Sequence, residues 1–322
     1  MCFDLRKRFA KETIMERSCL TNVWNGEYIN GADRACFFQR KRSDGRERPV
    51  FAMIRADFHT HTCYDHARGT PAEMAAEALR TGMTALGMVG HARMEFFCDY
   101  AMTPEGERRF FAEMQALKAQ YAGRLDLFCG VELDYYSLPV DLPYDYRIGS
   151  VHYIKSEGHV ISVDSDPEEL VEDVRRCWGG DFKRLYQIYY ETVADILNKT
   201  GADIVGHIDL ISKFNEDGRL FSMEDPAYRR AALDAVDALL AKDPLFEINS
   251  GAISRGCRTT PYPLPWILKE IHDRGGRILL SSDAHEVGTM LFRFGQSAEL
   301  AKAAGFRTVW TLTGDGFQER PL

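Results

Sequence analysis

The sequence predicts an α/β fold in which parallel strands close into a barrel. From residue 51 onward, short apolar runs of strand-like composition alternate with helix-like stretches, and seven or eight such units follow one another. Strands that alternate with helices form parallel sheets, and this number of units favours a closed barrel over an open doubly wound sheet. Hydrophobic residues make up 45% of the 322 residues, so a sizeable core can be buried.

The first helix has the clearest boundaries. Thr70, Pro71 and Glu73 provide an N-cap, a first-turn proline and a capping-box glutamate, and Gly82 signals the helix end. The strands are expected at 52–58, 84–89, 126–131, 147–151, 203–206, 245–249 and 277–281, with a further candidate at 307–312. The helices are expected at 71–82, 104–121, 167–177, 181–199, 226–241, 263–274 and 296–304.

Residues 1–52 differ from the rest of the chain. Residues 1–50 carry 11 Lys and Arg against 7 Asp and Glu, a net charge of +4, so the formal charge of −8 leaves −12 for residues 51–322. We expect a poorly ordered or atypical N-terminal extension, with a true subdomain or arm as the alternative, followed by a barrel domain over 53–322. The acidic charge of this domain argues against a nucleic-acid partner.

The cysteines and the hydropathy pattern indicate a cytoplasmic protein. The eight cysteines form no Cys-x-x-Cys pair, which is typical of reduced thiols rather than of a disulfide framework. No apolar run reaches the length of a transmembrane helix, and Met1 to Leu20 carries charges without the apolar segment of a signal peptide. No membrane partner is therefore expected, and the sequence leaves the oligomeric state open.

A polar residue capable of catalysis or metal binding follows each of the first seven predicted strands. Because the carboxyl ends of barrel strands lie on one face, residues far apart in the sequence would converge there. In chain order these residues are His59 and His61, then His91, Glu132, His152, His207, Asn249, and finally Asp283 and His285.

These residue types suit transition-metal ions. Imidazole and carboxylate together bind Zn, Mn or Fe. His59-Thr60-His61 places two imidazoles on the same side of an extended strand, and Asp283-Ala284-His285 repeats that spacing. Asp57 is in phase with His59 and could bind a metal or orient a ligand. A single His-x-His is common by chance, but seven of nine histidines at predicted strand ends favour a metal site.

These motifs resemble the polymerase and histidinol phosphatase (PHP) superfamily, and within it the histidinol-phosphatase type. The matching stretches lie in the correct order over residues 53–290. They are Asp57-Phe-His-Thr-His-Thr62, Gly90-His91, Gly130-Val-Glu132, Ile148-Gly-Ser-Val-His152, Gly206-His-Ile-Asp-Leu210 with Lys213-Phe214, Glu247-Ile-Asn249 and Ser282-Asp-Ala-His285.

The resemblance implies a distorted, TIM-like (β/α)7 barrel that holds two or three divalent metal ions. It implies His59, His61, His91, Glu132, His152, His207, Asp283 and His285 as metal ligands. His66 is the candidate for a further ligand, although it lies one residue nearer to the first motif than the family spacing. Asp57 and Asn249 are expected to support the ligands from behind.

The implied activity is hydrolysis of a phosphomonoester. A hydroxide that bridges two metals would attack phosphorus, and a third metal would bind the non-bridging oxygens. Asp283 and His207 are the catalytic candidates, and Asp283 or a water would protonate the leaving group. Arg255 and Arg258 are candidates for phosphate contacts, because arginine forms forked bonds to phosphate.

The expected substrate is L-histidinol phosphate, in histidine biosynthesis, and the loop Met94–Tyr100 is expected to contact its ammonium and imidazole groups. Alternatives are a PHP-type phosphoesterase for another small phosphate ester or nucleotide, a metal-dependent amidohydrolase, and a metal-binding protein without catalytic activity. The amidohydrolase alternative is disfavoured because no lysine follows the third, fourth or fifth predicted strand in a bridging position.

Overall fold

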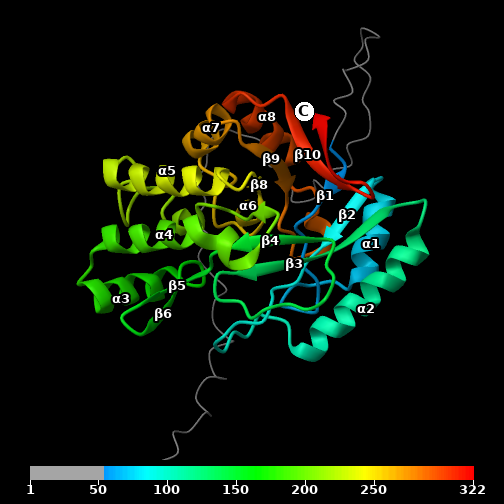
Figure 1. The fold of residues 1–322 in the computed structure, drawn as a ribbon, viewed down its shortest axis with the longest axis horizontal. Coiled ribbons are helices and arrows are strands. Elements are labelled where there is room, and N and C mark those ends of the chain that lie inside the picture. Colours follow the sequence, from blue (N-terminus) through cyan, green and yellow to red (C-terminus); the bar gives the residue numbers. More distant parts are fainter. Residues whose placement is uncertain (1–53) are drawn as a thin grey trace, which may run out of the picture. The chain divides into compact units, whose positions relative to one another are not determined.

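The computed structural model describes residues 54–322, and seven parallel strands form a nearly closed barrel within them (Figure 1). Between the last and first strands, Thr60 forms a bridge with Ala284, and His61 N donates to the carbonyl of Ala284 at 2.8 Å. The strands, in spatial order, are β1 (Ala56–Asp57), β2 (Ala85–Met88), β3 (Asp126–Asp134), β4 (Tyr146–Ser150), β7 (Ile204–Val205), β8 (Leu245–Asn249) and β9 (Arg277–Ser281). The predicted parallel barrel is confirmed.

The first helix begins at its predicted capping signal. Thr70 Oγ1 accepts a hydrogen bond from Glu73 N at 3.2 Å, and the Glu73 carboxylate accepts one from Thr70 N at 2.8 Å, which is a complete capping box. The helices are α1 (Pro71–Arg80), α2 (Pro104–Tyr121), α3 (Pro167–Trp178), α4 (Phe182–Thr200), α5 (Pro226–Leu240), α6 (Gly251–Ser254), α7 (Pro265–Asp273) and α8 (Phe294–Ala304), with 3-10 turns η2 (Leu210–Ser212) and η3 (Val287–Thr289).

Two hairpins lie outside the barrel sheet. The further strand candidate 307–312 forms β10 (Thr308–Thr313), which pairs antiparallel with β11 (Gly316–Pro321) and is not part of the seven-stranded barrel. A second hairpin, β5 (Tyr153–Ser156) with β6 (His159–Ser162), follows β4 and was not predicted. Its strands have only four residues each, which is the shortest length at which an alternating pattern indicates a strand.

A large aromatic residue fills the barrel interior. Tyr146 is 1% exposed, and its hydroxyl donates to the carbonyl of Phe58 at 2.6 Å. A Cβ at Gly130 would overlap the Tyr146 ring, so the glycine of the Gly130-Val-Glu132 motif leaves room for the tyrosine. Leu312, from the β10–β11 hairpin, packs into the same hydrophobic cluster.

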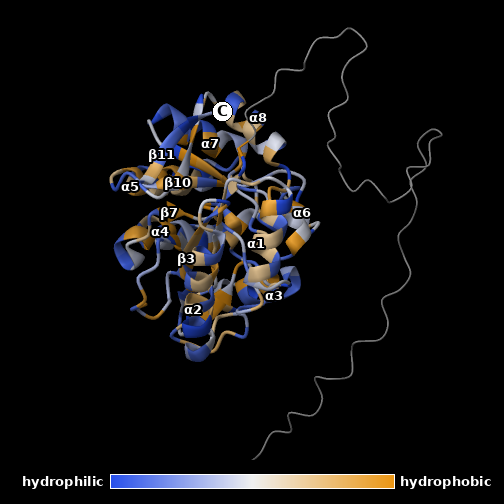
Figure 2. Cartoon of the chain, turned by 90° about the vertical axis from the view of Figure 1, so that its right-hand side faces the viewer, coloured by the Kyte–Doolittle hydropathy of each residue, from blue (hydrophilic) through white to orange (hydrophobic). Residues whose placement is uncertain are grey.

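The hydrophobic residues of the strands and of the surrounding helices face the interior of the barrel domain. In Figure 2 the inner segments are mostly coloured as hydrophobic, while hydrophilic residues gather on the outer helical faces. No helix among residues 54–322 is long and apolar enough to cross a membrane. The predicted extension 1–52 lies outside the described residues, and the proposed barrel domain is described from residue 54.

Candidate metal centre

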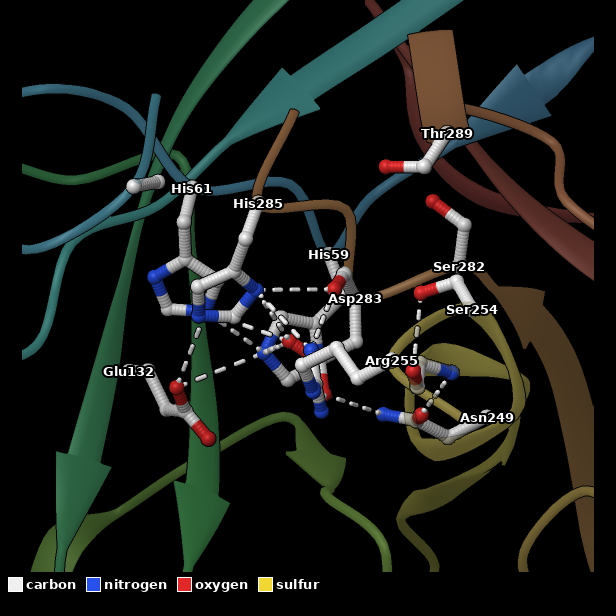
Figure 3. A network of polar contacts seen from close by, with 12 residues as sticks. His59, His61, Glu132, Asn249, Ser254, Arg255, Ser282, Asp283, His285 and Thr289 are labelled. Carbon is white, nitrogen blue, oxygen red and sulfur yellow. Dashed lines mark hydrogen bonds and ion pairs between the residues drawn. The ribbon is translucent and has the colours of Figure 1, made fainter. Parts of the chain in front are cut away.

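The structure brings the predicted cluster together at the carboxyl ends of the strands. Figure 3 shows the part of it around His59, His61, Glu132, Asp283 and His285. The parallel register causes this convergence, because adjacent strands end at nearly the same height. Residue His91, just after β2, forms a bridge with Glu132 in β3, and Asn249, the last residue of β8, pairs with Ser281 of β9. Residues separated by more than 200 positions therefore share one small volume.

Glu132 lies at the centre of this cluster and is 1% exposed. Its Oε2 lies 3.3 Å from His59 Nε2, 3.3 Å from His61 Nε2 and 3.1 Å from His91 Nδ1. Its Oε1 lies 3.3 Å from His207 Nε2 and 3.6 Å from His152 Nε2. The two carboxylate oxygens thus face two separate groups of imidazoles, as they would in a carboxylate that bridges two metal ions.

Asp283 and His285 complete the cluster on the side of β9. Asp283 Oδ1 lies 3.6 Å from His61 Nε2 and 3.8 Å from His59 Nε2. Arg255 donates to Asp283 Oδ2 at 3.0 Å, and its other terminal nitrogen lies 3.0 Å from His285 Nδ1. Asp283 has a φ of 49°, and a Cβ at Gly251 would lie 2.6 Å from its carboxylate, so the neighbouring backbone leaves room for this side chain.

Three carboxylates that the sequence did not single out orient the histidines. Glu247 Oε2 lies 2.8 Å from His59 Nδ1, and Asp65 Oδ2 lies 2.6 Å from His61 Nδ1. Asp134 accepts a hydrogen bond from His152 N at 2.7 Å, and its Oδ2 lies 3.4 Å from His152 Nδ1. A carboxylate on one ring nitrogen fixes the imidazole and directs the other nitrogen toward a metal.

Asn249 and Asp57, the two residues expected to support the metal ligands, make different contacts. Asn249 Nδ2 donates to Glu247 at 2.8 Å and lies 3.4 Å from Asp283 Oδ2, so it supports two carboxylates of the cluster. Asp57 accepts bonds from the backbone of Ser282 at 3.1 Å and of Leu291 at 3.1 Å. Asp57 therefore ties β1 to the segment after β9, and burial raises its pKa to about 6.

His66 lies at the exposed edge of the cluster. Its ring centroid is 4.5 Å from that of His285 and 5.2 Å from that of His91. Ligand atoms of His66, Asp65 and His91 lie within 4.8 Å of one another, so they could hold one ion. Burial lowers the pKa of His66, and His61 lowers it further.

Arg258 does not join Arg255 in the cluster. It is 4% exposed, and its guanidinium donates to Ser212 Oγ at 2.8 Å and to the Thr260 carbonyl at 3.2 Å. It also stacks over the ring of Tyr262. These contacts anchor the loop after α6.

Only part of the predicted substrate loop, Met94–Tyr100, faces the cluster. The Tyr100 ring centroid lies 4.7 Å from that of His91, whereas Phe97 is 92% exposed and Glu95 pairs with Lys155. Tyr100 is therefore the residue of this loop that is best placed to meet a ligand at the cluster.

The cluster mixes opposite charges in a buried space. Burial would raise the pKa of Glu132, but His59 and the other imidazoles hold it well below its usual range. Burial would lower the pKa of His61, but Asp65 and Glu132 raise it to about 9. Burial lowers the pKa of His285 to about 3, and His61 acts in the same direction. The Glu132 carboxylate is thus ionised at neutral pH, as a metal ligand must be.

The donor atoms fit a cluster of divalent metal ions. Glu132 Oε2 is buried and has no hydrogen-bond partner among residues 54–322, although three imidazole nitrogens surround it. A buried carboxylate oxygen normally has a partner, and a metal shared with those nitrogens would provide one. The described residues contain four overlapping groups able to hold an ion, and their members are His59, His61, Asp65, His66, His91, Glu132, His152, Asp283 and His285.

Comparison with protein families identifies the family of the chain. The model of the PHP domain matches residues 57–251, a span that begins at β1 and ends just after β8. The chain belongs to the PHP domain family. All of the cluster before Asp283 lies within the matched part of this PHP domain.

Similar proteins agree with this assignment. A "probable histidinol-phosphatase" of Deinococcus radiodurans is 33% identical over 264 residues, which cover 79% of this chain and 95% of that protein. The histidinol-phosphatase of Bacillus subtilis is 26% identical over 266 residues, 75% of this chain and 97% of that protein. The Lactococcus lactis histidinol phosphate phosphatase, solved with zinc, L-histidinol and phosphate, has the same fold, with a TM-score of 0.61, 19% identity, and coverage of 82% and 99%.

Proposed function

We propose that this PHP domain is a metal-dependent phosphomonoesterase that hydrolyses L-histidinol phosphate to L-histidinol and phosphate. The observation that carries the proposal is the Glu132 carboxylate, whose two oxygens face separate groups of imidazoles, with Arg255 beside the same cluster. The names of the Deinococcus and Bacillus relatives supply the substrate. A small phosphorylated substrate and a cytoplasmic location, which the scattered cysteines favour, belong to the same proposal.

The ligands of two or three zinc, manganese or iron ions would be the residues named from the sequence. They are His59, His61, His66, His91, Glu132, His152, His207, Asp283 and His285. When bound, such ions supply hydroxide near neutral pH and neutralise the charge of the phosphate oxygens. Glu247 and Asp65 keep the imidazole rings of His59 and His61 in place before any ion or substrate arrives, and Asp134 holds the backbone of His152.

Arg255 and Asp283 are placed to act on the reacting groups. The Arg255 side chain is 32% exposed, so its guanidinium is accessible to a phosphate that enters the cluster. Burial would raise the pKa of Asp283, but Arg255, together with the nearby histidines, holds it well below its usual range. Asp283 is therefore ionised, and its Oδ1, which lies outside the bond from Arg255 to Oδ2, is the oxygen proposed to take the proton of the attacking water.

The reaction balances with a single transferred proton. The water oxygen forms a new bond to phosphorus, and the bond between phosphorus and the ester oxygen breaks. The proton that Asp283 Oδ1 accepts from the water passes to the departing alkoxide, which leaves as L-histidinol. His207, whose Nε2 lies 3.3 Å from Glu132, holds the opposite side of the cluster in this scheme.

The test is a comparison of phosphate release from a panel of esters by the purified full chain. The panel contains L-histidinol phosphate, p-nitrophenyl phosphate, a sugar phosphate, a nucleoside monophosphate and a phosphodiester. We expect kcat/KM to be highest for L-histidinol phosphate, and Asp283→Asn to lower it by at least about 100-fold. Asp273→Asn, an exposed carboxylate on α7, is the matched control. A higher kcat/KM for another ester would overturn the substrate assignment but not the proposed phosphatase activity.

A further inference from the structure

A wall of aromatic rings stands beside the histidine cluster. Tyr100 lies edge-on to His91, with ring centroids 4.7 Å apart, and stacks on Tyr153 at 6.2 Å and 12° between the ring planes. Phe96 extends the wall, with its centroid 5.1 Å from that of Tyr153. Tyr153 is the first residue of β5, so the wall is built jointly by the 94–100 loop and the hairpin inserted after β4.

The same hairpin delivers a carboxylate to this rim. Asp164 follows β6, and Lys213 donates to its carbonyl at 2.7 Å and to its Oδ2 at 3.2 Å. The Asp164 side chain is 23% exposed, and its charge acts on His152 and His207. Lys213 thus fixes the carboxylate near the cluster, and Oδ1 lies outside the ion pair.

Tyr100 supplies a second sign that this rim receives a ligand. Its hydroxyl is buried and has no hydrogen-bond partner among residues 54–322. Val163, the residue before Asp164, donates from its backbone to the carbonyl of His152 at 2.9 Å, and Ser162 pairs with Tyr153. Asp164 therefore follows the strand that lies beside Tyr153, on which Tyr100 stacks. A buried hydroxyl without a partner is costly unless a ligand or water completes it.

We propose that Asp164, with Tyr100 and Tyr153, forms the subsite that binds the protonated amine of the leaving alcohol. A metal cluster and Arg255 would bind the dianionic phosphate, but they would repel an ammonium held on the same small molecule. Asp164 offsets that repulsion, because an ionised carboxylate accepts several hydrogen bonds, and aromatic faces attract cations. The inference rests on the proposed phosphatase function and makes Asp164 its specificity residue.

The hairpin adds this subsite beside the metal centre without supplying its central carboxylate. Asp164 and Tyr153 come from the segment between β4 and α3, whereas the central Glu132 comes from the barrel sheet itself. A change at Asp164 should therefore alter which ester is preferred without removing the metal ligands.

The test compares two esters that differ only in the amine. L-Histidinol phosphate and the phosphate of 3-(imidazol-4-yl)propanol, which lacks the amine, are assayed with wild type, Asp164→Asn and the exposed control Glu169→Gln on α3. Wild type should prefer the amine-bearing ester, and Asp164→Asn should reduce that preference by about 10- to 100-fold, the value of a charged hydrogen bond. Glu169→Gln should keep the wild-type ratio.

Two results would overturn the subsite. The first is a wild-type enzyme that hydrolyses both esters equally well, and the second is an equal loss for both esters in Asp164→Asn. If wild type hydrolyses neither ester, calorimetry of L-histidinol binding to the metal-loaded proteins still tests the subsite. Weaker binding to Asp164→Asn would then support the subsite while the phosphatase proposal fails, and equal binding would contradict the subsite as well.

Discussion

At the scale of residues, the sequence predicted the candidate metal ligands better than the residues that support them. The histidines and Glu132 could be identified because each follows a strand, and parallel strands end on one face. Glu247 and Asp65 could not, because a carboxylate that orients an imidazole has no characteristic spacing, although Glu247 shares a strand face with Asn249. Arg258 matched the chemistry of a phosphate contact, yet its bonds to Ser212 and Thr260 are decided by loop packing.

The central carboxylate gives the first prediction. Glu132→Gln keeps the shape of the side chain but removes the charge that lies between the two groups of imidazoles. We expect at least one fewer bound metal ion per chain and a loss of turnover of at least about 100-fold. Elemental analysis and phosphate release measure both effects. Full metal content with full activity would show that Glu132 is not a ligand.

The support of His59 gives the second prediction. Glu247→Gln removes the charge that faces His59 Nδ1 at 2.8 Å, and the change should weaken metal binding by about 10- to 100-fold. Competition with a chromogenic chelator measures the affinity. Glu191→Gln, an exposed carboxylate on α4, should bind metal as wild type does. Equal metal affinities of Glu247→Gln and Glu191→Gln would show that Glu247 does not support the metal site.

At the scale of elements, the alternation of strands and helices could be predicted from the sequence, whereas the hairpins could not. The N-cap and proline signals located the start of α1. In contrast, β1 and β7 are only two residues long, and the predicted runs 52–58 and 203–206 overestimate them. The strand 307–312 exists, but its pairing with β11 depends on contacts that local composition does not encode. The β5–β6 hairpin, which carries the proposed specificity residue, has four-residue strands.

The barrel interior gives a prediction at this scale. Gly130→Ala places a methyl group against the Tyr146 ring, which is 1% exposed and cannot move outward. We expect a loss of about 1–3 kcal/mol in the free energy of unfolding, the usual cost of overpacking. Denaturant titration measures this loss. Gly295→Ala, where an added Cβ meets no atom within 4 Å, is the control, and equal stability of both variants would contradict the packing argument.

At the scale of the whole molecule, the metal centre joins strands from all around the barrel. Its side chains come from the ends of β1, β2, β3, β4, β7 and β9. Ions bound there would stabilise the folded state by mass action, because the unfolded chain cannot assemble the site. The site is thus expected to contribute to stability as well as to chemistry.

Removal of metal tests that expectation. Binding at about 1,000 times the dissociation constant contributes about 4 kcal/mol, and each kcal/mol shifts the Tm of a domain of this size by about 2–4 °C. Dialysis against a chelator should therefore lower the Tm by about 10 °C, and added Zn²⁺ should restore it. Calorimetry of the two forms provides the measurement, and identical melting curves would show that folding and the ions are not coupled.

The most direct test of the central claim is phosphate release from L-histidinol phosphate by the metal-free protein as Zn²⁺ is added back. We expect no turnover without metal and full turnover only when two or three ions are bound per chain. Turnover that is equally fast without metal, or no turnover with Zn²⁺, Mn²⁺ or Fe²⁺ bound in that ratio, would contradict the central claim.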